Sequence, residues 1–122
     1  MGVVHHSRYF VWFEMGRIEF ARRAMLDFKG MEKQRTYLPV IDAKCKYRKS
    51  ALFDDEIIIR TSLEIPKMAR LSFCYEIFRK QGHERLASGS TIHAILVEGK
   101  GLIIGMPEEM KNKISDFLYQ LS

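Results

Sequence analysis

The sequence has few cysteines and prolines and no long apolar run. Two of its 122 residues are cysteine and three are proline. Cys45 and Cys74 are too few for a disulfide framework, and no C-x-x-C or H-x-x-x-H spacing indicates a zinc site. No apolar stretch approaches the roughly 20 residues that cross a bilayer, and the start lacks the charged region of a signal peptide. We therefore expect reduced thiols, no membrane span and a cytoplasmic location.

Acidic residues are outnumbered by basic ones. There are 15 of the former and 20 of the latter, which gives a formal net charge of +5 and favours anionic partners. Nucleic acid is one such partner and a phosphate-bearing cofactor is another. The chain has no zinc finger, RNP1-like motif or basic helix, and this argues against nucleic acid. Its length and its 47% hydrophobic fraction fit a single globular domain over residues 1–122.

Apolar residues from position 7 to about position 28 recur every three or four residues, which predicts a helix. The apolar stripe is wide, so we expect this helix to be buried on most sides. We expect Ser7 to cap its start and Gly30 to end it. The centre of the stripe is formed by Tyr9, Phe13, Gly16, Phe20 and Ala24.

Four strand-like runs follow, at residues 36–48, 56–65, 70–80 and 85–99. In the first run, Ile41, Ala43, Cys45 and Tyr47 share one face, and Asp42, Lys44, Lys46 and Arg48 share the other. A short linker centred on Gly82 predicts an antiparallel hairpin, and Gly89 indicates a bulge or a close backbone approach. Residues 107–121 form an amphipathic pattern typical of a terminal helix. A long helix, an antiparallel sheet and a second helix make an α+β fold.

Two groups of residues are candidates for chemistry. His5 and His6 precede the predicted helix, where free amides and the helix dipole can hold an anion or polarise a carbonyl. A solvated histidine pair is the plainer alternative, and spacing alone favours it. The acidic cluster of residues 54–56 can supply acid–base chemistry, but a turn that stops strand pairing is the more common role. His93 lies in an apolar strand, which is typical of a core histidine.

Basic residues lie at the ends of predicted strands. Lys67 and Arg70 flank one connection between strands. Cations placed in this way can bind phosphate groups, although a solvated basic rim fits the pattern equally well.

The opening segment resembles a known family of enzymes. Residues 2–20 read GVVHHSRYFVWFEMGRIEF, and Gly2, Val4, His6 and Tyr9 fit the pattern D-x-x-G-(I/V)-V-x-(H/Y)-x-x-Y. Hotdog-fold acyl-CoA thioesterases open in this way, in particular those similar to 4-hydroxybenzoyl-CoA thioesterase and the Tol–Pal-associated thioesterase. The segment ALFDDEIIIRT also resembles their approach to the next strand, and the order of elements agrees along essentially the whole chain.

The resemblance implies a fold, a reaction and an assembly. The fold would be an antiparallel sheet wrapped around the long helix, and two or four protomers would associate with active sites between them. The amide and side chain of His6 would act on a thioester carbonyl. Lys67 and Arg70 would meet the phosphates of coenzyme A. The resemblance implies no metal and no cofactor apart from the coenzyme A of the substrate, and we expect Val4, His5 and Tyr9 to contribute to substrate binding.

The sequence departs from this family at one position. The essential Asp of the family stands three residues before the motif glycine, and here that position falls just before Met1, together with the first strand of the family. We expect acyl-CoA hydrolysis in which this Asp belongs to a segment upstream. The alternative is a hotdog dimer without catalysis that binds acyl-CoA or has a structural role.

Overall fold

The computed structural model describes residues 2–64, 68–103 and 105–121. Three helices are present: α1 Ser7–Arg23, α2 Phe28–Lys33 and α3 Glu108–Leu121. The main strands are β2 Val40–Tyr47, β3 Ile57–Leu63, β4 Arg70–Arg79 and β5 Glu84–Ala94. Three two-residue strands are β1 Thr36–Tyr37, β6 Leu96–Val97 and β7 Gly101–Leu102.

The four main strands form an antiparallel sheet in the order β2-β5-β4-β3. The predicted hairpin is the β4–β5 connection, where Gly82 adopts a φ of 76° inside a short 3-10 turn. This left-handed backbone costs little for glycine. The predicted alternation of β2 holds from Asp42 to Tyr47, because the strand has an irregularity only between Val40 and Asp42.

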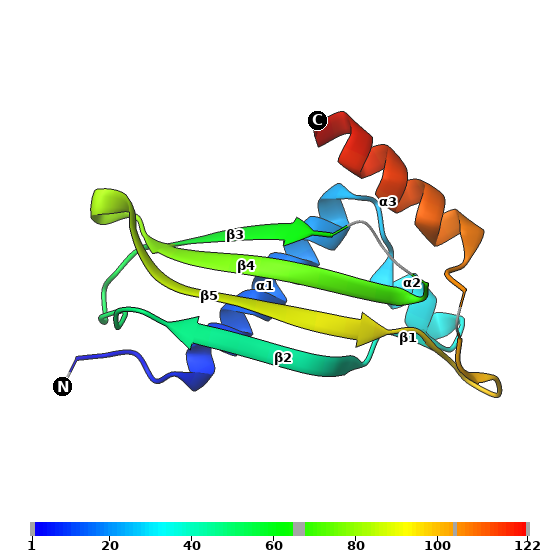
Figure 1. Cartoon of the computed structure of the whole chain (residues 1–122), viewed down its shortest axis with the longest axis horizontal. Coiled ribbons are helices and arrows are strands. Elements are labelled where there is room, and N and C mark those ends of the chain that lie inside the picture. The colour runs from blue at the N-terminus through cyan, green and yellow to red at the C-terminus, as the bar shows by residue number, and fades with distance from the viewer. Residues whose placement is uncertain (1, 65–67, 104, 122) are drawn as a thin grey trace.

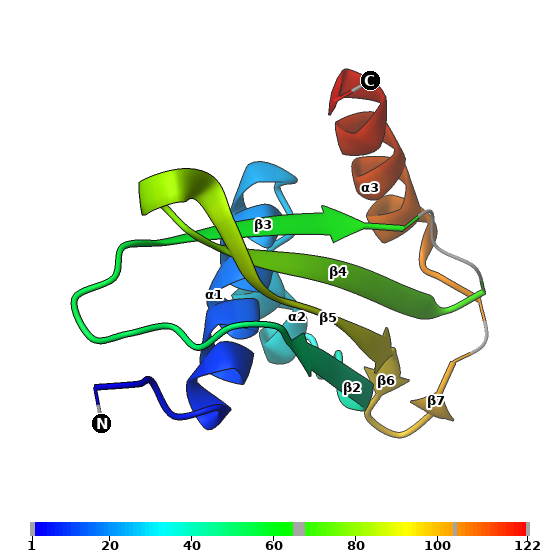
Figure 2. The same ribbon diagram turned by 60° about the vertical axis from the view of Figure 1, so that its left-hand side comes forward.

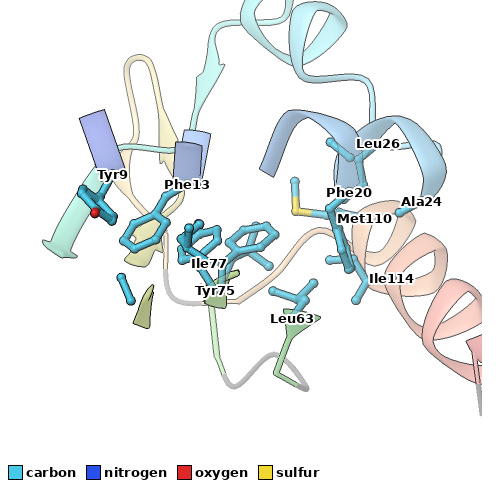
Figure 3. Close-up of a cluster of buried hydrophobic side chains, with 14 of the residues drawn as sticks. Tyr9, Phe13, Phe20, Ala24, Leu26, Leu63, Tyr75, Ile77, Met110 and Ile114 are labelled. Carbon is cyan, nitrogen blue, oxygen red and sulfur yellow. The ribbon is translucent and has the colours of Figure 1, made fainter. Parts of the chain in front are cut away.

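Helix α1 lies across one face of this sheet (Figure 1). Phe13 is fully buried and stacks on Tyr75 of β4, with ring centroids 4.4 Å apart. Gly89 of β5 permits this packing, because a Cβ at that position would lie 2.5 Å from the Phe13 ring. Figure 3 shows the aromatic and aliphatic side chains that fill the space between the helix and the sheet. The sheet therefore wraps around a central helix, as expected. The helix is nevertheless not buried on most sides within one protomer, because Val11, Met15 and Ile18 on its outer face are exposed.

The end of the first helix differs from the prediction. Helix α1 stops at Arg23, and Met25 takes a left-handed φ of 60° at the turn. A separate short helix, α2, begins after Asp27, whose carboxylate accepts a hydrogen bond from the amide of Gly30. Gly30 thus belongs to the first turn of α2 and does not end α1. Periodicity alone missed this break because the apolar spacing continues through it.

The terminal helix packs against the far end of α1, beyond the edge strand β3 (Figure 2). Met110 and Ile114 of α3 are buried, and Phe117 meets Phe20 edge to face at 5.1 Å. The small strands form a second sheet, β1-β6-β7, beside α2. Among the described residues, no helix is long and apolar enough to cross a membrane.

Candidate active site

The residues just before α1 are held against the loop that follows β2. The amide of Val4 donates to the carbonyl of Ala51 at 2.8 Å, and the amide of Phe53 donates to the carbonyl of Gly2 at 2.9 Å. This pairing fixes where the helix starts. Segments near a terminus are usually poorly ordered unless contacts of this kind restrain them.

Tyr9 anchors the same region from within the core. Its side chain is 2% exposed, and its hydroxyl accepts a hydrogen bond from the amide of Ala51 at 2.9 Å. The ring meets Trp12 and Tyr47 edge to face, with centroids 4.9 and 5.0 Å away. Tyr9 therefore lies beneath the helix start as a support and does not line the pocket beside it.

Tyr47, at the end of β2, holds the backbone of His6. Its hydroxyl donates to the His6 carbonyl at 3.2 Å. Desolvation, followed by the neighbouring Cys45, raises the pKa of Tyr47 to about 12, so the phenol stays protonated and able to donate. His6 occupies the N-cap position of the helix, and its own side chain makes no capping hydrogen bond. The Ser7 hydroxyl bonds instead to Nδ1 of His5 at 2.8 Å, so the predicted Ser7 cap is wrong.

The amide of His6 is an open donor at this helix start. The amide of Ser7 donates to Nδ1 of His5, and those of Arg8 and Tyr9 donate to the carbonyls of His5 and His6. No hydrogen bond among the described residues uses the His6 amide. The positive end of the helix dipole acts at the same point. An incoming carbonyl oxygen, or the oxyanion that forms from it, is the type of group that such a donor stabilises.

A pocket of about 480 Å³ opens beside this helix start. Its lining combines apolar side chains with two carboxylates, a guanidinium and an imidazole. This combination suits a ligand that has an apolar body and a polar reacting group. The lining residues are Val4, His5, Ser7, Arg8, Trp12, Leu52, Phe53, Asp54, Asp55 and Ile57.

Two aspartates of the acidic cluster at residues 54–56 differ in their contacts. Asp55 accepts a hydrogen bond from the amide of Leu52 at 2.7 Å and pairs with Arg79 at 3.0 Å. The Leu52 amide first, and then Arg79, hold the pKa of Asp55 below its usual value. Asp54 has a left-handed φ of 73° and lines the pocket, and no ion pair among the described residues includes it. These contacts support the structural interpretation for Asp55.

Of the two basic candidates, only Arg70 can be placed, and it does not join this site within one protomer. Lys67 lies outside the described residues. Arg70 starts β4 opposite Ala94, whereas Tyr47 beside the helix start lies opposite Ala87. Seven residues along β5 separate these positions, which corresponds to roughly 23 Å. Arg70 is exposed at the other end of the sheet.

Comparison with known proteins identifies the family. The sequence profile of the thioesterase-like superfamily matches residues 1–114. The chain belongs to this superfamily. A proposed esterase of Aquifex aeolicus is 30% identical to this thioesterase-like chain over 115 residues, which are 94% of this chain and 87% of the relative. A proposed acyl-CoA thioesterase of Bacillus subtilis is 26% identical over 91 residues, covering 75% of this chain and 66% of that protein.

Solved structures agree with this assignment. A DHNA-CoA thioesterase from Staphylococcus aureus superposes with a TM-score of 0.84 at 26% identity, covering 99% of this chain and 80% of that one. The thioesterase-like chain thus has the predicted hotdog fold, and membership of the superfamily supports thioester hydrolysis as its general activity.

Other histidines of the thioesterase-like chain lie apart from the pocket. His93 is 4% exposed and is satisfied by the carbonyl of Leu38 at 3.1 Å and the hydroxyl of Thr91 at 3.0 Å. Its burial lowers its pKa, so the ring is kept neutral. The core interpretation of His93 is confirmed. Sequence reasoning missed the contact of Tyr47 with His6, because strand alternation predicts only that Tyr47 shares a face with Cys45.

Proposed function

We propose that this protein hydrolyses an acyl-CoA thioester to a free acid and coenzyme A. The observation that carries the proposal is the open amide of His6 beside a pocket that is partly apolar. The relatives add support, because the names of two of them specify coenzyme A thioesters.

In the proposed reaction, the thioester carbonyl accepts a hydrogen bond from the His6 amide. A carboxylate attacks the carbonyl carbon or removes a proton from an attacking water. The carbonyl oxygen gains negative charge, which the amide and the helix dipole stabilise. When the C–S bond breaks, coenzyme A leaves as a thiolate and takes up a proton. If the carboxylate has attacked directly, water then hydrolyses the mixed anhydride, which releases the free acid and restores the carboxylate. The imidazole of His6 assists at the same carbonyl, and Val4 and His5 position the substrate from the pocket wall.

The family resemblance assigns the carboxylate to an Asp three residues before the motif glycine, Gly2, a position that falls before Met1. Asp54 is the alternative within the chain, because it lines the pocket without an ion pair among the described residues. Two amide substitutions separate these candidates, each made in a protein that contains the upstream Asp. One replaces that Asp with Asn, and the other is Asp54→Asn. We expect the upstream exchange to slow hydrolysis by about 10²–10⁴-fold and Asp54→Asn to have little effect.

Binding of the coenzyme A phosphates is assigned to Lys67 and Arg70, also from the resemblance. Arg70 lies too far from His6 to share a compact ligand within one protomer. An extended coenzyme A, or one that spans two protomers of a homodimer or homotetramer, can meet both. Replacing both cations with Ala should weaken coenzyme A binding most strongly at low salt, and unchanged affinity would remove them from the site.

Release of free thiol from a panel of aliphatic and aromatic acyl-CoA substrates tests the activity. We expect saturable hydrolysis of at least one class and inhibition by free coenzyme A. Tight binding of acyl-CoA without any turnover, even with the upstream residues present, would support the non-catalytic alternative and overturn the proposal.

A further inference from the structure

The outer face of the sheet, which is turned away from α1, carries a second hollow. This groove has a volume of about 430 Å³ and shares no lining residue with the pocket at the helix start. Four long cationic side chains and one carboxylate stand around it, an excess of three positive charges. These rim residues are Lys44, Lys46, Arg60, Arg85 and Glu76.

The groove exists because short side chains meet in one row across the sheet. Ser90 of β5 lies between Lys44 of β2 and Cys74 of β4, and Cys74 is paired in turn with Ser62 of β3. Alternate residues of a strand share a face, so these side chains point outward together. Ser62, Cys74 and Ser90 have short side chains, which leave a depression in the surface of the sheet. The long cationic side chains around them form its walls.

The ion pairs around the groove leave positive charge unneutralised. Glu76 is shared by Arg60 at 3.7 Å and by Arg85 at 3.1 Å, which holds both guanidinium groups at the rim. Lys44 is 3.9 Å from the carboxylate of Asp42, a distant pairing. No ion pair of the described residues includes Lys46.

We propose that this groove binds a small phosphorylated ligand, separately from the thioester site. A phosphate group carries several charges and acceptor oxygens, which match clustered cations and nearby hydroxyl donors. Ser88 and Ser90 supply such hydroxyls at the floor of the groove. The volume lies in the range of small-molecule sites. Glu76 sets the geometry of the two arginines but opposes the anion, so its removal strengthens binding.

Calorimetric titration of the intact protein with inorganic pyrophosphate at low ionic strength tests this inference. We expect saturable binding that weakens as salt rises. Replacing Lys44 and Lys46 together with Gln should weaken it by at least about tenfold. Glu76→Gln should have the opposite effect and tighten binding. Replacing Lys29 of α2 and Lys111 of α3 together with Gln also removes two positive charges, both outside the groove, and should leave the affinity unchanged.

Several results would overturn the inference. One is the absence of saturable binding by the unmodified protein. Another is equal weakening by the Lys29/Lys111 control and by the Lys44/Lys46 variant, because net charge alone would then explain the affinity. A third is binding that occurs only when the protein dissociates, as followed by sedimentation, which would mean that a second copy of the chain covers this face. The acyl-CoA assay is independent of all three readouts, so failure here leaves the proposed hydrolysis standing.

Discussion

The hydroxyl of Tyr9 accepts a hydrogen bond from the backbone amide of Ala51, at 2.9 Å and in the buried core. This bond joins the first turn of α1 to the loop that also pairs with the residues before the helix. The position of the open His6 amide therefore depends on a side chain that does not line the pocket. Ala51 is itself fully buried, so water cannot replace the phenol as the acceptor for its amide.

Exchanging Tyr9 for Phe tests this relationship. The variant leaves the Ala51 amide buried without an acceptor, which should reduce the free energy of unfolding by about 1–3 kcal/mol. Denaturant unfolding measures that loss, and Tyr37→Phe, at a partly exposed position in β1, is the control. Because Tyr9 acts through the helix start, we also expect slower hydrolysis. Stability equal to that of the control would show that the bond is unimportant.

Asp55 makes stability depend on pH in the acid range. Its pKa in the folded protein lies below the usual value of about 4, because the Leu52 amide and Arg79 favour the charged form. When the pKa of a carboxyl is lower in the folded than in the unfolded protein, the charged group stabilises the fold at every pH above the unfolded pKa. This contribution is lost as the pH falls through the folded pKa. Asp55→Asn should therefore be less stable than the unmodified protein at neutral pH, and the difference should shrink as the pH falls below the usual pKa of an Asp.

The matched control for this prediction is Asp116→Asn, which removes an exposed carboxylate from α3. Denaturant midpoints measured across the acid range compare the two variants. A difference between Asp55→Asn and the unmodified protein that stays constant with pH would contradict the assigned role, since steric change alone would then explain it.

The main sheet was predictable because its strands alternate clearly. The side chains of Lys44 and Lys46 stand at the outer groove, and Cys45 between them packs against the core, as period-two alternation predicts. Gly89 was expected at a bulge or a close approach; its pairing is regular and the close approach is that of the Phe13 ring. Sequence alternation predicted a strand best where one face of the strand is buried. In such a strand, a shift of register by one residue would move the apolar side chains into water, so the apolar and polar residues must alternate.

Other features could not be predicted from the sequence. The left-handed turn at Met25 ends α1 without glycine or proline, so no local signal marks it. Strands of two residues, such as β1 and β6, are too short to have a period. The outer groove depends on three strands that bring Ser62, Cys74 and Ser90 into one row, and that row exists only after the strands pair.

We predict that the protein is larger than a monomer in solution. Helix α1 leaves a stripe of apolar side chains uncovered, including Val11, Met15 and Ile18 at 40%, 53% and 57% exposure. Contiguous apolar surface of this kind marks an interaction surface. Light scattering at micromolar concentration should report a dimer or a larger assembly, and Glu at both Met15 and Ile18 should reduce its mass. Asn112→Glu on α3 is the control for added charge. A monomeric mass for the unmodified protein would refute the prediction.

The role of the His6 amide can be separated from that of its imidazole by two substitutions at the same position. His6→Ala removes the ring and keeps the amide, whereas His6→Pro removes both. Proline should fit the backbone here, because His6 has a φ of −59° and no hydrogen bond of the described residues uses its amide. Loss of one donor to a developing oxyanion typically lowers kcat by about 10²–10³-fold. We therefore expect His6→Pro to lose at least that factor in thiol release, and His6→Ala to lose clearly less. Circular dichroism and thermal unfolding verify that both variants are folded. A folded His6→Pro protein that hydrolyses acyl-CoA as fast as His6→Ala would show that the amide does not stabilise the oxyanion, and the reaction would then depend on donors elsewhere in the pocket.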